Sequence, residues 1–295
     1  MRVTNRMIQD TVITHISLNA RRVEELESQL TSGKKISRPS DDPPAVVRAL
    51  AFEAGITAGE QYLRNMDMSL AWLHATDATL ESGTQLLQRA RELAVQGASD
   101  GQSSQQRDAI AGEIDQILEQ MVVIGNSSLR GQRLFAGLKT DANPFTLNAG
   151  PPTTVSYAGD SGQMVREIDS GTTVQINMPG DSFLPQVFTA LIDLRDDLRA
   201  GNSTAVGSSD LGAIDTAMDR LLEVRSDVGA RVNRLENAVE RQELIQVRLQ
   251  ELLSKTEDVD MAQAISNFAL QENVYKASLA AGAKALQPSL LDYLR

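Results

Sequence analysis

Residues 12–30 read VITHISLNARRVEELESQL, and this stretch decides how the rest of the chain can be interpreted. Its apolar residues recur at intervals of four and three, with one asparagine in the series. Such intervals place side chains on one narrow face of an α-helix, which is the seam that a coiled coil needs. The members of the series are Val12, Ile16, Asn19, Val23, Leu26 and Leu30.

A second series of the same kind lies near the other end of the chain. Glu272 and Gly282 occupy two intervening points of its seven-residue register. Two narrow seams at the extremities, each without a mate in its own segment, indicate that the ends pair with each other or with neighbouring copies. This favours an assembly protein over a catalyst. The apolar members of the second series are Ile265, Phe268, Tyr275, Leu279 and Leu286.

Helix-start and helix-stop residues divide the N-terminal part of the chain. A first helix is expected from about residue 5 to residue 32, and Gly33 offers its stop. A turn rich in Pro and Asp follows. Asp42 is the expected N-cap, with Pro43 at the first helical position, for a long helix that reaches about residue 96.

The middle of the chain changes character twice. Ser103 and Gln106 form a capping box for a third helix that ends near Gly125. Gly, Pro, Thr and Ser then become frequent between residues 143 and 180, where helical spacing disappears and short strands are expected. Strands are predicted around residues 155–157, 164–168 and 173–177.

Helical spacing resumes after the β segment and continues almost to the C-terminus. Residues 200–209 are expected to be a flexible joint. A strict heptad series then runs from Val228 to Leu253, in which Gln242 and Gln246 are expected to fix the register at some cost in stability. The pattern breaks at residues 255–260, before the terminal helix.

These elements predict a mainly α fold with a small β insert. The expected architecture is an elongated antiparallel helical coiled-coil or bundle hairpin, with both termini at one pole and a β-rich outer domain at the tip. Three domains are predicted. Residues 1–42 and 256–295 form a terminal coiled-coil domain, residues 43–137 and 183–255 a long-helix rod domain, and residues 138–182 the small β outer domain.

Composition narrows the classes of partner. The chain has 295 residues, 28 Lys and Arg and 39 Asp and Glu, which gives a net charge of -11. Nucleic acid and anionic membranes are therefore disfavoured as partners. The chain has no cysteine, so disulfides and thiolate metal sites are excluded. Neither a cleavable signal peptide nor an apolar run long enough to span a bilayer is visible.

The inventory of reactive side chains argues against catalysis. Only two histidines occur, His15 and His74, each on an expected helix. General acid–base chemistry needs positioned partners in a pocket, and the spacing provides none. Asp41 and Asp42 are interpreted as turn and N-cap residues in preference to a cation site. No catalytic residue, cofactor site or metal site is therefore predicted.

Several motifs resemble those of the bacterial flagellin superfamily. Residues 30–36 (LTSGKKI), followed by residues 40–43 (SDDP), resemble its N-terminal hallmark. Residues 87–96 (LQRARELAVQ) are similar to the motif of its second helix. Residues 225–235 (RSDVGARVNRL) resemble the counterpart in the returning arm. Because these blocks lie on both arms, the resemblance covers most of the chain.

Two further blocks favour one branch of that superfamily. Residues 135–145 (FAGLKTDANPF) resemble the entry into the outer domain of the proteins that join the flagellar hook to the filament. Residues 286–294 (LQPSLLDYL) are similar to the C-terminus of the same branch. The resemblance thus implies a junction protein, with two alternatives left open: flagellin itself, the main filament subunit, and a cytoplasmic coiled-coil scaffold.

The resemblance carries expectations about location and partners. It implies export through the flagellar type III channel without a cleaved signal peptide, and an extracellular location in the bacterial flagellum at the hook–filament junction. The implied partners are hook-associated protein 1, flagellin, further copies of the chain in a ring, and a cytoplasmic flagellar export chaperone. The terminal helices are expected to form the inner tube and to become ordered on assembly.

The predicted assembly interface combines both terminal seams and the C-terminal motif. Its alternative interpretation is an ordinary helical bundle within one chain. We favour packing between subunits because the stripes are narrow and would leave apolar surface in water if only one pair of helices formed. The predicted interface residues are Ile16, Val23, Leu26, Leu30, Ile265, Phe268, Tyr275, Leu279, Leu286, Leu290 and Leu291.

Overall fold

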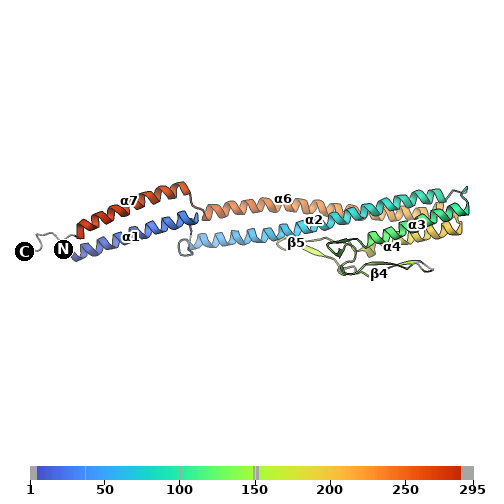
Figure 1. The fold of residues 1–295 in the computed structure, drawn as a ribbon, viewed down its shortest axis with the longest axis horizontal. Helices are drawn as coiled ribbons and strands as arrows, with labels where there is room; N and C mark the ends of the chain where they lie inside the picture. The colour runs from blue at the N-terminus through green and yellow to red at the C-terminus, as the bar shows by residue number, and fades with distance from the viewer. Residues whose placement is uncertain (1–4, 37, 100, 149, 151–152, 287–295) are drawn as a thin grey trace, which may run out of the picture. The chain divides into compact units, whose positions relative to one another are not determined.

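The computed structural model describes residues 5–286 except 37, 100, 149, 151 and 152, and most of these residues are α-helical (Figure 1). The chain divides into two compact units. Unit 1 comprises Met1–Ala58 and Ile245–Arg295, and unit 2 comprises Gly59–Leu244. Unit 1 is therefore assembled from two segments at opposite ends of the sequence, and unit 2 from the continuous segment between them.

Unit 1 is built around an antiparallel pair of helices, α1 (Asn5–Ser32) and α7 (Met261–Leu286), which lie side by side in Figure 1. The start of α1 faces the end of α7, because a Cβ placed at Gly282 would lie 2.8 Å from Ile16 Cδ1. At the other end of the pair, Lys34 forms an antiparallel bridge with Asp258. The two terminal helices thus form one antiparallel pair, as the sequence predicts.

Backbone hydrogen bonds join the segment that follows α1 to the segment that precedes α7. Gly33, at a φ of +71° that favours glycine, ends α1. Its carbonyl accepts a bond from the Val259 amide at 3.0 Å, and the Lys35 amide donates to the Glu257 carbonyl at 2.6 Å. The helix stop at Gly33 is therefore also the place where the two arms of unit 1 are joined.

Unit 1 also contains the first turns of α2 (Pro43–Gly97) and the last turns of α6 (Leu211–Glu257). The Ala45 amide donates to Asp42 Oδ1 at 3.1 Å, so Asp42 caps α2 as its sequence position predicts. Gln246 Nε2 donates to the Ile56 carbonyl at 3.2 Å. The predicted register glutamine therefore bonds the neighbouring helix in this unit.

Unit 2 packs the remainder of α2 and α6 with α3 (Ser104–Gly125) and α4 (Leu184–Ala200). Its core follows the heptad spacing of α2. Side chains seven residues apart on that helix are at most 1% exposed, and they belong to the same cluster as the apolar residues of the other three helices. The α2 members are Met66, Leu73, Leu80, Leu87 and Ala94.

Three antiparallel hairpins follow α3 before the chain returns to helix. Each is a separate two-stranded sheet, and the third contains a register shift between Glu167 and Asp169. A short 3₁₀ turn, η1 (Gly180–Ser182), leads into α4. The hairpins are β1 (Ser128–Leu129) with β2 (Gln132–Arg133), β3 (Phe145–Asn148) with β4 (Thr154–Tyr157), and β5 (Val165–Asp169) with β6 (Thr172–Gln175).

Side chains hold the β segment to the helices. Asn126, at the end of α3, pairs with the backbone of Phe145: its amide donates to the carbonyl at 2.7 Å and its oxygen accepts from the N–H at 2.9 Å. The hydroxyl of Tyr157 donates toward the carbonyls of Asp160 and Phe135, at 2.8 and 3.1 Å. The side chain of Asn126 thus makes the two backbone hydrogen bonds with Phe145 that a residue of a neighbouring strand would otherwise make.

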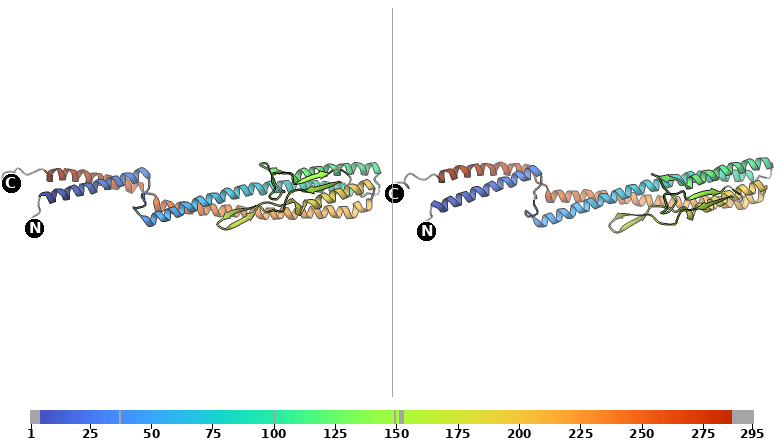
Figure 2. Two further views of the ribbon diagram at one scale, coloured as in Figure 1. Left: turned by 90° about the horizontal axis from the view of Figure 1, so that it is seen from below. Right: turned by 60° about the horizontal axis from the view of Figure 1, so that its bottom comes forward.

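The predicted position of the β segment at the tip of the bundle is corrected by the structure. The chain turns from α2 into α3 at one end of unit 2 (Figure 1). At that end, Gly97 lies against Leu198 and Val206. The β5–β6 hairpin instead bonds Asn65, more than thirty residues earlier on α2, through the Glu167 carbonyl at 2.9 Å. Figure 2 shows the hairpins alongside the helices of unit 2.

The physical reason lies in the length of α3. This helix has 22 residues, which at 1.5 Å per residue return the chain by about 33 Å before the first hairpin begins. The β segment therefore starts part of the way back along the bundle. The fold class itself, mainly α with long antiparallel helices and a small β insert, is confirmed.

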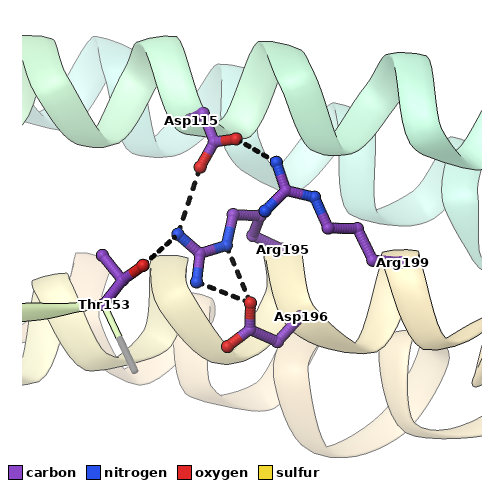
Figure 3. A network of polar contacts seen from close by, with 5 residues as sticks. All are labelled: Asp115, Thr153, Arg195, Asp196 and Arg199. Carbon is purple, nitrogen blue, oxygen red and sulfur yellow. Dashed lines mark hydrogen bonds and ion pairs between the residues drawn. The ribbon is translucent and has the colours of Figure 1, made fainter. Parts of the chain in front are cut away.

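A buried arginine joins α3, α4 and the residue before β4 (Figure 3). Arg195 donates to Asp115 Oδ1 and to Thr153 Oγ1, at 3.2 and 3.1 Å, and bonds Asp196 Oδ1 at 2.5 Å. Arg199 pairs with the second oxygen of Asp115. Burial opposes the charge, but the bonds to Asp196 and Asp115 outweigh it and raise the pKa of Arg195.

The expected flexible joint at residues 200–209 is instead mostly helical. Gly201, with a φ of +73°, ends α4. A turn of helix, α5 (Ser203–Ala205), and a π-helical turn, η2 (Val206–Asp210), then lead directly into α6. The small and polar residues in this stretch suggest a loop, but Val206 is fully buried in the core and holds the segment in place.

Other expectations from the sequence are met closely. The first helix runs over Asn5–Ser32, the capping box of Ser103 and Gln106 is present in both directions, and the three predicted strands correspond to β4, β5 and β6. Strands β1, β2 and β3 are missed, because two-residue strands and a single partner strand leave almost no alternation to detect. The division into three domains stays a prediction.

Candidate assembly interface

The predicted interface residues of α1 form the face that meets α7. Ile16, Val23, Leu26 and Leu30 are all half-buried. Asn19, in the same series, accepts a hydrogen bond from Gln271 at 3.4 Å, so the polar position of the seam is matched by a polar partner on α7. Within one chain, the N-terminal stripe is therefore used for pairing the two terminal helices, and it is covered only in part.

The predicted residues of α7 separate into two groups. Phe268 and Tyr275 are half-buried on the side toward α1. Ile265 and Leu279 are 55% and 42% exposed on a neighbouring face. The structure therefore does not bring all of the predicted residues together into one seam. Some of them pair the two helices, and others remain in solvent.

The two groups arise because, at every other position of the predicted series, the residue that faces α1 is the one immediately before the predicted residue. The observed inner face continues through Gln271 and Ser278, where the predicted series has Glu272 and Leu279. Small side chains explain the choice, because α1 approaches α7 closely enough that a Cβ at Gly282 would lie 2.8 Å from Ile16 Cδ1. The inner face consists of Ala264, Phe268, Gln271, Tyr275, Ser278 and Gly282.

Three of the predicted residues are not placed by their side chains. Leu286 is the last residue of α7, and its backbone alone is described. Leu290 and Leu291 lie outside the described residues. Their assignment to the interface stays a prediction.

Burial differs sharply between the two units. Among the described residues, the large side chains that are less than 2% exposed all lie in unit 2. The buried apolar residues of unit 1 are Ile36 and three alanines, at positions 45, 49 and 264. Unit 1 therefore folds without a core of large side chains, and its helices keep apolar surface in solvent.

Exposed apolar side chains occur on every helix segment of unit 1. They lie on both flanks of α1 and α7 as well as on the parts of α2 and α6 that belong to this unit. Such density on helices that lack a core marks a surface for interaction. The residues are Met7, Ile13, Leu18, Val47, Leu50, Ile245, Val247, Met261, Ile265, Leu270, Val274 and Leu279.

Charge is divided as unevenly as burial. The sequence of unit 1 contains thirteen Lys and Arg and thirteen Asp and Glu, so its formal charge is zero. The sequence of unit 2 contains fifteen and twenty-six, respectively, so it carries the entire net charge of -11. Copies of unit 1 can therefore approach one another without the net repulsion that copies of unit 2 experience.

One ion pair joins the two arms of unit 1 where the terminal helices stop. Lys34 Nζ lies 2.5 Å from Glu257 Oε1. The hydrogen bond to Glu257 raises the pKa of Lys34, with a smaller opposing effect of burial and further support from the charges of Glu53 and Asp258. The lysine therefore remains charged over the whole physiological pH range, and its ion pair joins the segment after α1 to the end of α6.

The described part of the chain contains no group of three or more His, Asp or Glu side chains that could hold a metal ion. Within the same residues, no helix is both long and apolar enough to cross a membrane. What the arrangement offers is a set of helix faces whose apolar side chains are covered only in part.

Sequence reasoning missed the outer faces of the terminal helices. Ile13 and Leu18 on α1, and Leu270 and Val274 on α7, are exposed but lie off the heptad series. A signal was present, because apolar residues on more than one face of a helix indicate a helix that is surrounded on assembly. The search for a single narrow stripe overlooked it.

The fold and this interface define a class of long-helix structural protein whose N- and C-terminal segments pair. The family model for the bacterial flagellin N-terminal helical region matches residues 3–140, and the model for the bacterial flagellin C-terminal helical region matches residues 211–294. Together they cover most of the chain. The chain belongs to the bacterial flagellin family.

Individual relatives agree with this assignment. The chain is 22% identical to flagellar hook-associated protein 3 of Salmonella typhimurium, over 94% of this chain and 95% of the relative. It is 26% identical to a flagellin of Halalkalibacterium halodurans, over 95% of each chain. The crystal structure of Bacillus cereus FlgL has the same fold, with a TM-score of 0.60 and 24% identity over 69% of this chain and 99% of that one.

Proposed function

We propose that this chain is a structural subunit that joins the flagellar hook to the filament, and that it has no enzymatic role. Similarity to hook-associated protein 3 of two bacteria, over 94% of this chain, supports a position at the junction. The proposed neighbours are hook-associated protein 1, flagellin and further copies of the chain in a ring. Before assembly, a cytoplasmic export chaperone would hold the subunit, which would then leave by the flagellar type III route without cleavage of a signal peptide.

The observation that carries the proposal is the missing core of unit 1. Ordering a helix costs roughly 1–2 kcal/mol per residue in backbone entropy. A fully buried Leu, Ile or Phe returns about 1.5–3 kcal/mol, and the seam residues of α1 and α7 are only half-buried. We infer that neighbouring subunits complete this burial, so that the terminal helices become ordered on assembly.

A double truncation tests this mechanism. Deletion of residues 1–38 and 258–295 removes both terminal helices and leaves unit 2 intact. The trimmed protein should retain the melting midpoint of unit 2 but fail to join hooks when added to a strain that lacks the full-length chain. The full-length chain with Val123→Asp, an exposed change on unit 2, is the control and should assemble. Normal assembly of the trimmed protein would contradict the mechanism.

Flagellin is the second candidate, because flagellins match the chain over similar lengths. The two functions make different demands on the purified protein. A filament subunit extends seeds into long filaments by itself, whereas a junction subunit stops after a short zone. Electron microscopy of seeds incubated with the purified chain distinguishes them, and long filaments would favour flagellin.

A further inference from the structure

A groove lies in unit 1 between the turn after α1 and the first turns of α2. Its volume is about 150 Å³, and the end of α6 closes it at Glu257. Apolar side chains form most of its lining, which also contains one cation, Arg38, and two anions, Glu53 and Glu257, here called its rim. The residues that matter here are Ile36, Val46, Ala49, Leu50, Arg38 and Glu53.

The groove has the size and the openness to receive one side chain. A cavity of about 150 Å³ is large enough to hold benzene, so it matches a single aliphatic or aromatic residue. Leu50, on its wall, is 58% exposed, and Val47 beside it on the same helix is also exposed. Apolar surface is therefore presented to solvent at Leu50 in the lining and at Val47, one turn earlier on the same helix, a position that we call the edge of the groove.

The charges around the groove select the kind of partner. Glu257 is already paired with Lys34. Among the described residues, no ion pair is formed by the side chains of Arg38 or Glu53, so one positive and one negative group remain on the rim. This mixed rim suits a neutral surface with both signs of charge, as in unit 1, and does not suit the strongly acidic unit 2.

We propose that this groove receives an apolar side chain from unit 1 of a second copy of the chain. The inference rests on the proposed assembly function and names the surface that assembly uses. The groove and the protruding apolar side chains are different patches on the same molecule. Contacts between them are therefore heterologous, and such contacts build rings or helical arrays instead of closed two-fold dimers.

Cross-linking tests the identity of the occupant. Because the chain has no cysteine, Val47→Cys creates a single thiol at the edge of the groove, to which a benzophenone maleimide can be attached. After incorporation into flagella and irradiation, the cross-linked partner peptide is identified by mass spectrometry. The expected peptide comes from residues 1–58 or 245–295 of a second copy. A peptide from residues 59–244, or from any other flagellar protein, overturns the inference.

Substitution tests whether the groove is needed. Leu50→Asp should reduce incorporation into flagella about tenfold, because the charge must be buried when the groove is filled. Leu50→Met should restore it. Val123→Asp introduces the same charge at a side chain on unit 2 that is 70% exposed, and should leave incorporation within about twofold. Equal melting midpoints in all three variants exclude a folding defect of unit 2, and normal incorporation of Leu50→Met shows that unit 1 tolerates a change at this position.

The two experiments separate this inference from the proposed function. If the unsubstituted chain is itself absent from the hook–filament junction of purified flagella, the junction function fails and this inference falls with it. If the control and Leu50→Asp are both incorporated normally, the groove is not an assembly surface although the proposed function stands. Loss of Leu50→Asp alone, with the expected cross-link from position 47, supports the groove.

Discussion

Tyr157 illustrates how single residues fasten the β segment of unit 2. Burial raises the pKa of its phenol to about 12, with smaller contributions from Asp181 and Asp160. The hydroxyl therefore stays protonated at any physiological pH and donates toward the carbonyls of Asp160 and Phe135. Gly159 is part of the same arrangement, because a Cβ there would lie 2.4 Å from the hydroxyl oxygen.

Tyr157→Phe should lower the stability of unit 2 by about 1–2 kcal/mol, because the Asp160 carbonyl loses the phenol as a donor and the Phe135 carbonyl keeps only the Gly180 amide, while the ring remains. The measurement is urea unfolding followed by circular dichroism. Tyr62→Phe is the matched control, since no hydrogen bond of the Tyr62 hydroxyl occurs within the described residues. Equal midpoints for the two variants would contradict the role given to Tyr157.

Arg195 is the second residue on which the fold of unit 2 depends. Arg195→Met should cost about 2–3 kcal/mol, because Asp115 and Asp196 lose a buried, charged donor. Arg220→Met, which removes an exposed pair with Glu223 on one helix, should leave the thermal midpoint almost unchanged. If both variants melt at the same temperature, the network in Figure 3 contributes nothing specific.

Asp210 gives unit 2 a defined response to pH. Burial, followed by the charge of Asp197, raises the pKa of its carboxyl above the ordinary value of 3.8. The folded state thus binds the proton more tightly than the unfolded state. The associated stability is full below the unfolded pKa and is lost as the pH rises through the folded pKa.

Asp210→Asn should therefore raise the melting midpoint near pH 7 and reduce its decline as the pH rises above the ordinary carboxyl pKa of 3.8. The asparagine keeps the shape of the side chain without the buried charge. Thermal melts across this pH range are compared with those of Asp219→Asn, which removes an exposed carboxylate of α6 that forms no ion pair among the described residues. A steeper decline in Asp210→Asn than in the parent chain would reverse the sign argued here.

At the scale of elements, two glycines allow the pairing of helices to be tested separately from the stability of a single helix. Gly282 lies where α1 comes closest to α7, whereas a Cβ at Gly229 on α6 would meet nothing within 4 Å. Gly229→Ala should stabilise unit 2 by about 0.5–1 kcal/mol through helix propensity. Gly282→Leu should instead force the terminal helices apart and reduce incorporation into flagella.

These two variants are measured by different methods, urea unfolding for Gly229→Ala and quantification of the chain in purified flagella for Gly282→Leu. Gly282→Leu should leave the stability of unit 2 unchanged. Undiminished incorporation of that variant would show that the close approach of α1 and α7 does not matter for assembly.

Elements with long-range periodicity were predictable from the sequence, and elements defined by local contacts were not. The spacing of Met66, Leu73, Leu80 and Leu87 anticipated the buried face of α2. The inner face of α7 was predicted only in part, because small residues such as Gly282 set the register there and hydrophobicity does not reveal them. The pairing of Asn126 with Phe145 leaves no periodic trace at all.

The candidate interface was predictable to a similar extent. The α1 residues Ile16, Val23, Leu26 and Leu30 share one face, as their spacing indicates. The groove beside Leu50 was not foreseen, since it is formed by the turn after α1, the first turns of α2 and the end of α6, which are distant in sequence. Its recognition needed the placement of these segments in unit 1.

At the scale of the whole molecule, burial and charge are distributed in opposite ways. Unit 2 holds the core of large side chains together with all of the net negative charge. Unit 1 has exposed apolar helices and no net charge. Such a division lets one part fold by itself while the other associates, because the apolar surface left in solvent lies on the unit that carries no net charge.

This division predicts how assembly responds to salt. Raising the ionic strength from about 0.05 to 0.5 M screens repulsion between copies of unit 2 and leaves the apolar contacts of unit 1 intact. Incorporation of the full-length chain onto isolated hooks should therefore increase or stay constant. The amount of bound chain, measured after sedimentation, would decrease with salt if contacts between opposite charges drove assembly instead.

Amide hydrogen exchange on the isolated chain and on the same chain in assembled flagella tests the central claim most directly. In the dilute monomer, residues 12–30 and 264–282 should exchange almost as fast as an unfolded peptide, while residues 66–94 are strongly protected. In flagella, all three segments should be protected. Terminal helices in the monomer that resist exchange as well as residues 66–94 would contradict the claim that neighbouring subunits complete their burial.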